Sequence, residues 1–116
     1  MDSILNTTKK AIGPTAQYEY FDPEIIMHIN SVFMDLEQIG VGPSHFTIED
    51  DTTVWSDFLP DDDINLEAVK SYMYLRVKLL FDPPTNSSMV QAMERQVDKW
   101  EWRLNHAVET RSKEEK

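Results

Sequence analysis

The densest group of potentially reactive side chains is a run of three aspartates, Asp61, Asp62 and Asp63. Together with Asn65 and Glu67, they place oxygen atoms at alternating positions, somewhat like a calcium-binding loop. The glycine that bends such a loop is missing, and the spacing to the last carboxylate is wrong. We therefore interpret the run as negative charge placed before a helix N-terminus, where the helix dipole favours it.

Residues that commonly bind metals or act as nucleophiles are otherwise scattered. His28, His45 and His106 lie far apart, and none has a second ligand three or four residues away. The chain has no cysteine, which excludes disulfides, cysteine-based zinc sites and thiol catalysis. Its three glycines form no nucleotide-binding fingerprint, and no motif joins a serine to histidine and aspartate. We therefore expect neither an enzyme nor a bound cofactor or metal, and we expect His28 to be a partly buried structural residue.

The bulk composition describes a single acidic domain. With 116 residues, of which 41% are hydrophobic, the chain is long enough for one core. It carries 11 basic and 21 acidic residues, a net charge of −10, which argues against sequence-reading DNA binding because it repels phosphates. No apolar run approaches the length of about 18 residues that spans a bilayer, and the first residues lack a signal-peptide pattern. We expect a protein that is made in a cytoplasm and does not enter a membrane.

Helices account for most of the apolar pattern in the first third of the chain. Ser3 is a suitable N-cap for a short helix over residues 3–12. Asp22 as N-cap and Pro23 at the first helical position predict a second helix over about residues 23–39, with apolar residues every three or four positions. Gly40 is a suitable residue to end it.

Two methionines of this second helix, Met27 and Met34, lie outside its main apolar stripe. Single apolar side chains are often exposed without a function, which is the simpler interpretation. The alternative is that they widen the apolar surface to form a subunit interface.

The segment after the second helix predicts an arm and a plug. Phe46, Thr47 and Ile48 form an alternating, β-branched stretch that is typical of a short strand or an extended arm. One helical turn over residues 53–59 would place Trp55 and Phe58 on the same side, where they would act as a hydrophobic plug.

A helical hairpin over residues 71–104 carries the clearest pattern in the chain. A third helix spans residues 64–81 and ends because Pro83 disfavours helical geometry at the residue before it. A fourth helix begins near Ser88, with Asn86 and Ser87 as alternative caps. The short linker makes these two helices antiparallel neighbours. The apolar residues of the fourth helix are spaced three and four apart: Val90, Met93, Val97, Trp100, Leu104 and Ala107.

Two aromatic residues of the hairpin, Tyr74 and Trp102, do not belong to that apolar stripe. Trp102 lies about 200° around the helix from Trp100. It either covers a loop of its own chain or, with Arg103 beside it, anchors a partner protein.

The sequence thus predicts a mainly α fold, a small helical bundle built on an antiparallel helical hairpin. A short extended arm or strand lies between the second and third helices. Residues 1–108 form the single domain, and residues 109–116 form a charged, flexible tail.

Five short strings, in this order and spacing, resemble the small head–tail connector proteins of long-tailed bacteriophages and prophages, also called adaptor or head-completion proteins. They are IIMHINSVF at 25–33, QIGVGP at 38–43, WSDF at 55–58, LLFDPP at 79–84 and EWRLN at 101–105. No single string is diagnostic, but five in register are fairly specific, and the resemblance covers roughly residues 1–108. The acidic tail lies outside the resemblance.

The resemblance implies a structural subunit of the virion neck. Such subunits assemble with copies of themselves into a ring of about twelve. The ring docks under the portal protein, extends the DNA channel, completes the head and offers a surface to the next neck or tail-completion protein. DNA would pass through without sequence-specific binding.

Under this interpretation, the candidate interface residues are Trp55, Phe58, Tyr74, Trp102 and Arg103, and the candidate channel-facing loop is Asp61, Asp62 and Asp63. The alternative function is a small acidic regulatory protein that binds a host nucleic-acid-binding protein by imitating the charge of DNA. That alternative is weakened because the carboxylates cluster in loops and at helix starts and do not line one helix face.

Overall fold

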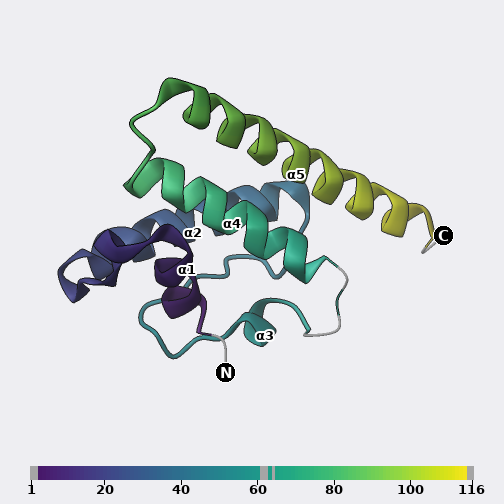
Figure 1. Ribbon diagram of the computed structural model, residues 1–116. Helices are drawn as coiled ribbons and strands as arrows, with labels where there is room; N and C mark the ends of the chain where they lie inside the picture. Colours follow the sequence, from purple (N-terminus) through teal and green to yellow (C-terminus); the bar gives the residue numbers. More distant parts are fainter. Residues whose placement is uncertain (1–2, 61–62, 64, 115–116) are drawn as a thin grey trace.

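The computed structural model describes residues 3–60, 63 and 65–114 and shows a bundle of helices (Figure 1). In chain order these are α1 (Ile4–Ile12), α2 (Asp22–Ile39), the single turn α3 (Trp55–Phe58), α4 (Leu66–Phe81) and α5 (Ser87–Glu114). Two 3-10 turns, Pro14–Gln17 and Glu19–Phe21, join α1 to α2. The predicted helical bundle is confirmed.

The two N-terminal helices begin and end largely where the sequence indicates. The Ser3 side chain accepts a hydrogen bond from the Asn6 N–H at 3.2 Å and caps α1. Gly40 ends α2 in a left-handed conformation, at φ +98°, and its N–H reaches the Leu36 and Glu37 carbonyls. The prediction of Asp22 as N-cap is wrong, because Asp22 is already helical. Its carboxylate lies 2.7 Å from the Lys9 ammonium instead.

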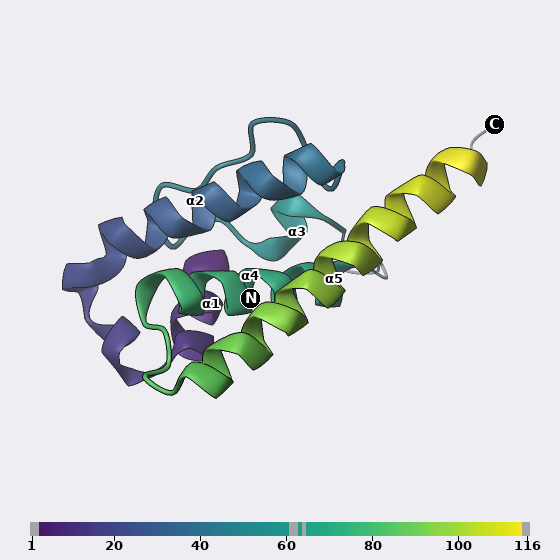
Figure 2. The same ribbon diagram turned by 90° about the horizontal axis from the view of Figure 1, so that it is seen from above.

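The hairpin of α4 and α5 is antiparallel, as predicted, and α5 crosses the bundle from one side to the other (Figures 1 and 2). Of the three candidate caps for α5, the structure uses Asn86, whose Oδ1 accepts from the Ser88 N–H at 2.8 Å and the Met89 N–H at 3.3 Å. Ser88 itself lies within the helix. The helix continues to Glu114, so the segment predicted as a tail begins as helix, and its flexibility stays a prediction.

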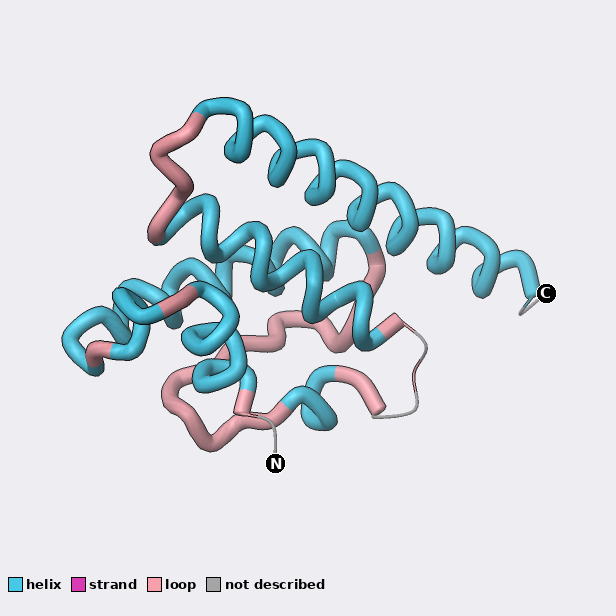
Figure 3. Tube along the Cα trace, in the orientation of Figure 1, coloured by secondary structure: helices cyan, strands magenta, loops and turns pink. Residues whose placement is uncertain are grey.

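The core lies around α4, which packs against α1, α2 and α5 (Figure 3). Val69, Tyr72, Met73 and Val77 of α4 are fully buried. The apolar stripe of α2 meets them from one side, and five of its residues are buried: Ile25, Ile29, Val32, Phe33 and Leu36. The half-buried His28 lies beside that stripe, as expected.

The predicted arm lies between α2 and α3, and its described residues form no strand beyond a single bridge between Ser3 and Val54. Asn30 holds the arm, because its side chain accepts from the Ile48 N–H at 2.8 Å and donates to the Ile48 carbonyl at 3.0 Å. Gly42, at φ +81°, lets the backbone approach Phe58, since a Cβ there would lie 2.3 Å from the ring.

Candidate functional site

Trp55 and Phe58 lie in the core of the chain, at 2% and 4% exposure. The Trp55 indole N–H donates to the Thr7 hydroxyl at 2.9 Å, and Phe58 packs against Phe33 with ring centroids 4.7 Å apart. The predicted plug is therefore confirmed. Tyr74 is half-buried against Trp55, with centroids 6.3 Å apart, so these three predicted interface residues meet inside one subunit.

Trp102 is 66% exposed, and no described loop of the chain covers it. Its indole stacks on the His106 imidazole one turn later, with centroids 5.2 Å apart and an interplanar angle of 3°. The stack presents a flat aromatic surface to solvent. The interpretation that Trp102 covers a loop of its own chain is thus wrong for the described residues. The interpretation that Trp102 anchors a partner protein stays a prediction.

Arg103, unlike Trp102, contacts a residue of the inner face of α5. Its guanidinium lies 5.0 Å from the centroid of the half-buried Trp100 ring, where a cation–π contact shields that ring. Arg103 is exposed and remains available to a partner, but its contact in the subunit is with the inner stripe of α5.

The inner face of α5 closes the bundle. Val97 and Leu104 are buried, at 8% and 1% exposure. Near the far end of the helix, Val108 lies against the turn after α2, because a Cβ on Gly40 would be 3.2 Å from the Val108 Cγ1. The inner face therefore holds α5 to both α4 and α2.

The outer face of α5, defined here as Gln91, Arg95, Asp98, Lys99, Trp102, His106 and Glu109, is exposed throughout. Its basic side chains are unusual in this chain: residues 1–86 carry 15 acidic and 5 basic side chains, whereas residues 87–116 carry six of each. Residues 1–86 are therefore strongly acidic, whereas α5 carries balanced charge and presents an aromatic face with charges of both signs.

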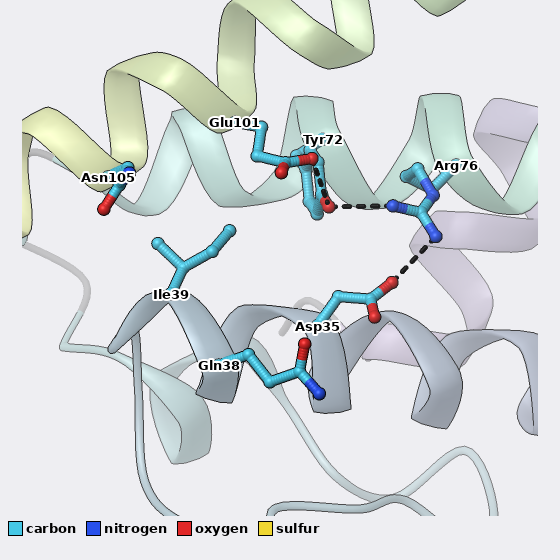
Figure 4. A pocket seen from close by; sticks show the side chains of 7 residues that line it. All are labelled: Asp35, Gln38, Ile39, Tyr72, Arg76, Glu101 and Asn105. Carbon is cyan, nitrogen blue, oxygen red and sulfur yellow. Dashed lines mark hydrogen bonds and ion pairs between the residues drawn. The ribbon is translucent and has the colours of Figure 1, made fainter.

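A polar cluster lies at the junction of α2, α4 and α5 and consists of Asp35, Tyr72, Arg76 and Glu101 (Figure 4). Arg76 donates through Nη2 to Asp35 Oδ2 at 2.7 Å and through Nη1 to the Tyr72 hydroxyl at 2.9 Å. The Tyr72 hydroxyl in turn donates to Glu101 Oε2 at 3.3 Å. One chain of hydrogen bonds thus connects all three helices.

The environment of the polar cluster keeps Tyr72 protonated. Burial raises the pKa of the Tyr72 phenol to about 12, the Arg76 guanidinium opposes this, and the Glu101 and Asp35 carboxylates add to it. A phenol with so high a pKa is a poor nucleophile or base at neutral pH. The adjoining hollow of about 290 Å³ is also lined by Gln38, Ile39 and Asn105. The arrangement suits a clamp that orients α5.

The polar cluster was not foreseen from the sequence. Arg76 stands in an otherwise apolar row of α4, four residues after Tyr72, and such a cation on a buried row demands a carboxylate partner. This position of Arg76 is the sequence signal that could have indicated an ion pair. Only the fold identifies Asp35, 41 residues away, as the partner.

Two candidate sites remain, a metal site and the predicted channel-facing loop. No group of three or more histidine, aspartate or glutamate residues among residues 3–60, 63 and 65–114 could hold a metal ion. Asp61 and Asp62 of the predicted channel-facing loop lie outside the described residues. Asp63 accepts from the Asn65 N–H at 2.8 Å through its side chain and from the Leu66 N–H at 3.1 Å through its carbonyl, so it initiates α4.

A family model described as phage connector protein matches residues 4–111. The chain belongs to the phage connector protein family. This confirms the resemblance to head–tail connector proteins, and the family consists of structural bacteriophage proteins that are generally not enzymes. Membership indicates association with other phage head or tail proteins and a place in the virion. No curated protein and no solved structure matches the chain. None of the helices in the described part of this connector combines the length and apolar character of a membrane span.

Proposed function

We propose that this connector is a structural subunit of the phage neck, which assembles into a ring of about twelve copies beneath the portal. The ring extends the DNA channel, completes the head and offers a docking surface to the next neck or tail-completion protein. The observation that carries the proposal is the family match over residues 4–111, joined to a helix with one face in the core and an opposite face exposed.

The charge of the chain supports a role beside moving DNA. A subunit with a net charge of −10 repels phosphates, so DNA can slide past without being held. We keep Asp61, Asp62 and Asp63 as the candidate channel-facing loop on this ground.

The contacts that hold α5 in place also support a role in assembly. Trp55 and Phe58 are buried, Tyr74 is half-buried against Trp55, and the polar cluster fixes α5 against α2 and α4. These contacts pre-organise the outer face of α5, which lowers the entropic cost of binding a partner. Among the five predicted interface residues, Trp102 and Arg103 are exposed, Tyr74 is partly exposed, and Trp55 and Phe58 are buried.

The test is binding to purified heads that carry a portal. We expect the connector to bind such heads, and heads from a phage that lacks its gene to lose packaged DNA. A connector that fails to bind portal-bearing heads, or deletion heads that retain DNA normally, would overturn the proposal. A monomer in solution would not, because a portal can act as the template for assembly.

A further inference from the structure

The outer face of α5 carries complementary side chains at matched distances on either side of Trp102. Arg95 stands seven residues before Trp102, and Glu109 stands seven residues after it. Asp98 stands four residues before it, and His106 stands four residues after it. Steps of four and seven residues return to nearly the same side of an α-helix, so all five side chains share one face. The face is therefore complementary to itself when the direction of the helix is reversed.

This face has no partner among the described residues of its own chain. All five side chains are exposed, and Trp102 is 66% exposed. Arg95, Asp98 and Glu109 form no ion pair with another described side chain. The contact that Trp102 does make is the stack on His106, which leaves a flat aromatic surface in solvent. A large exposed ring between unpaired charges is typical of a surface that contacts another protein.

The shape of the subunit leaves the outer face open along its length. The helix α5 lies on the outside of the bundle, and its C-terminal end extends beyond the other helices (Figures 1 and 2). Its inner face packs against α4 and α2, on the side opposite to Trp102. The bodies of two subunits would thus lie on opposite sides of a pair of α5 helices, where they do not collide.

We propose that two copies of this connector pair through the outer faces of their α5 helices, which lie antiparallel about a two-fold axis at Trp102. The two Trp102 indoles meet at the axis. About 10 Å along the helix, Arg95 of one copy faces Glu109 of the other. Between these positions, Asp98 of one copy accepts a hydrogen bond from the His106 imidazole of the other. Because the axis is two-fold, each pair forms twice.

A second copy is the occupant because the order of the side chains selects it. Reversal of the helix places Arg95 opposite a carboxylate and Asp98 opposite a hydrogen-bond donor. A parallel pair in register would instead place Arg95 beside Arg95 and Asp98 beside Asp98, and like charges across an interface are unfavourable. Residues 87–116 carry six acidic and six basic side chains, so two copies can meet at α5, whereas the strongly acidic residues 1–86 repel one another.

The pair closes on itself at two copies, because both copies use the same surface. It cannot be the contact between neighbours in the proposed ring, so it belongs to the protein before assembly. There it covers the Trp102 anchor until a portal-bearing head offers a competing surface. This covering role rests on the proposed neck function, whereas the pair itself does not.

Cysteine mapping tests the antiparallel pair, because the natural chain has no cysteine. One variant carries Asp98→Cys and the other carries His106→Cys, and a size tag on one of them distinguishes the possible dimers. Equal amounts are mixed in solution and treated with a short reagent that joins two thiols through reducible disulfide bonds. We expect the mixed dimer to dominate, since it brings the two cysteines together and keeps one pair of Asp98 with His106.

Two results would overturn the pair. Dominant self-dimers of either variant would show that each residue lies beside its own copy, as in a parallel contact. Wild-type protein that stays monomeric at every concentration in sedimentation would show that no pair forms. In both cases the neck function stands if the connector binds portal-bearing heads. A connector that pairs but fails to bind heads would overturn the neck function and the covering role, and would leave the pair in place.

The cross-linked mixed dimer also tests the covering role. Its two outer faces are locked together, so we expect it not to bind portal-bearing heads. Reduction of the disulfide bonds separates the copies and should restore binding. A locked dimer that binds heads as well as the reduced protein does would overturn the covering role.

A charge exchange provides a second test of the same pair. Arg95→Glu and Glu109→Arg should each weaken pairing by about tenfold or more, because the two-fold axis creates two like-charge contacts for each change. Both changes in one chain should restore pairing, as measured by sedimentation at low salt. Lys10→Glu, an exposed change on α1, is the charge control and should leave pairing unchanged. A double variant that pairs no better than the single variants would contradict the arrangement.

Discussion

Trp100 and Trp102 lie two residues apart on α5 and occupy opposite environments. Trp100 is half-buried under the Arg103 guanidinium on the inner face, whereas Trp102 is 66% exposed on the outer face and stacks only on His106. The inner face of α5 uses its apolar residues to close the subunit. The outer face holds exposed aromatic and charged residues that lie outside the core. The difference separates the residues that should affect folding from those that should affect assembly.

The largest effect on stability is expected from the inner face. Leu104 is 1% exposed, so Leu104→Ala removes buried methyl groups and leaves a cavity, at a cost of about 2–5 kcal/mol. Urea unfolding measures it, with the exposed Gln96→Ala as the control on the same helix. Equal losses in the two variants would contradict the assignment of the inner face.

Trp100→Ala should cost less than a fully buried tryptophan, about 1–3 kcal/mol, because part of the ring already faces solvent and Arg103. Thermal unfolding of Trp100→Ala, beside Trp100→Phe, checks the size of the loss. A cost as large as that of a completely buried tryptophan would mean that Arg103 and the neighbouring helix cover the ring more fully than described.

The polar cluster should contribute less to the free energy of unfolding, and its contribution should require both Arg76 and Asp35. Arg76→Ala leaves Asp35 and the Tyr72 hydroxyl without their donor, at a cost of about 1–2 kcal/mol. A double-mutant cycle with Asp35→Ala isolates the pair, and we expect a coupling energy of about 0.5–1.5 kcal/mol. Additive single changes would show that the two side chains do not hold α2 and α4 together.

The raised pKa of Tyr72 predicts a loss of stability at alkaline pH. The unfolded state releases the phenol proton from about pH 10, whereas the folded state keeps it until about pH 12, so this contribution is complete below pH 10 and falls as the pH rises through that window. Tyr72→Phe cannot titrate there.

The difference in unfolding free energy between wild type and Tyr72→Phe should therefore shrink from about pH 9 to about pH 11. Urea unfolding at the two pH values measures it. Parallel pH profiles of the two proteins would contradict the buried, protonated phenol.

The sequence predicted the parts of the fold that depend on local patterns. Helical periodicity placed α2 and the hairpin, and Gly40 and Asn86 marked a helix end and a helix start. Cap choice was less predictable, because Ser88 and Asp22 are equally good caps by type, yet both lie within their helices. Asp22 is drawn into α2 beside Lys9, and no local rule encodes that contact.

The candidate site was predicted only in part, for the same reason. The period of α5 was enough to separate Trp102 from the inner stripe. It could not show that Trp55 and Phe58 share one interior cluster with Phe33 and Phe46, because these contacts join distant segments. The polar cluster depends on three helices meeting at one point, and a single sequence does not specify that geometry.

We infer that the inner face of α5 stabilises the fold of the subunit and that the outer face supplies the contacts of the assembly. Trp102→Ala tests it most directly, measured in parallel by thermal unfolding and by binding to portal-bearing heads. We predict a stability change within about 0.5 kcal/mol of wild type and a clear loss of assembly. A Trp102→Ala protein that unfolds, or one that assembles as well as wild type, would contradict the division between the two faces.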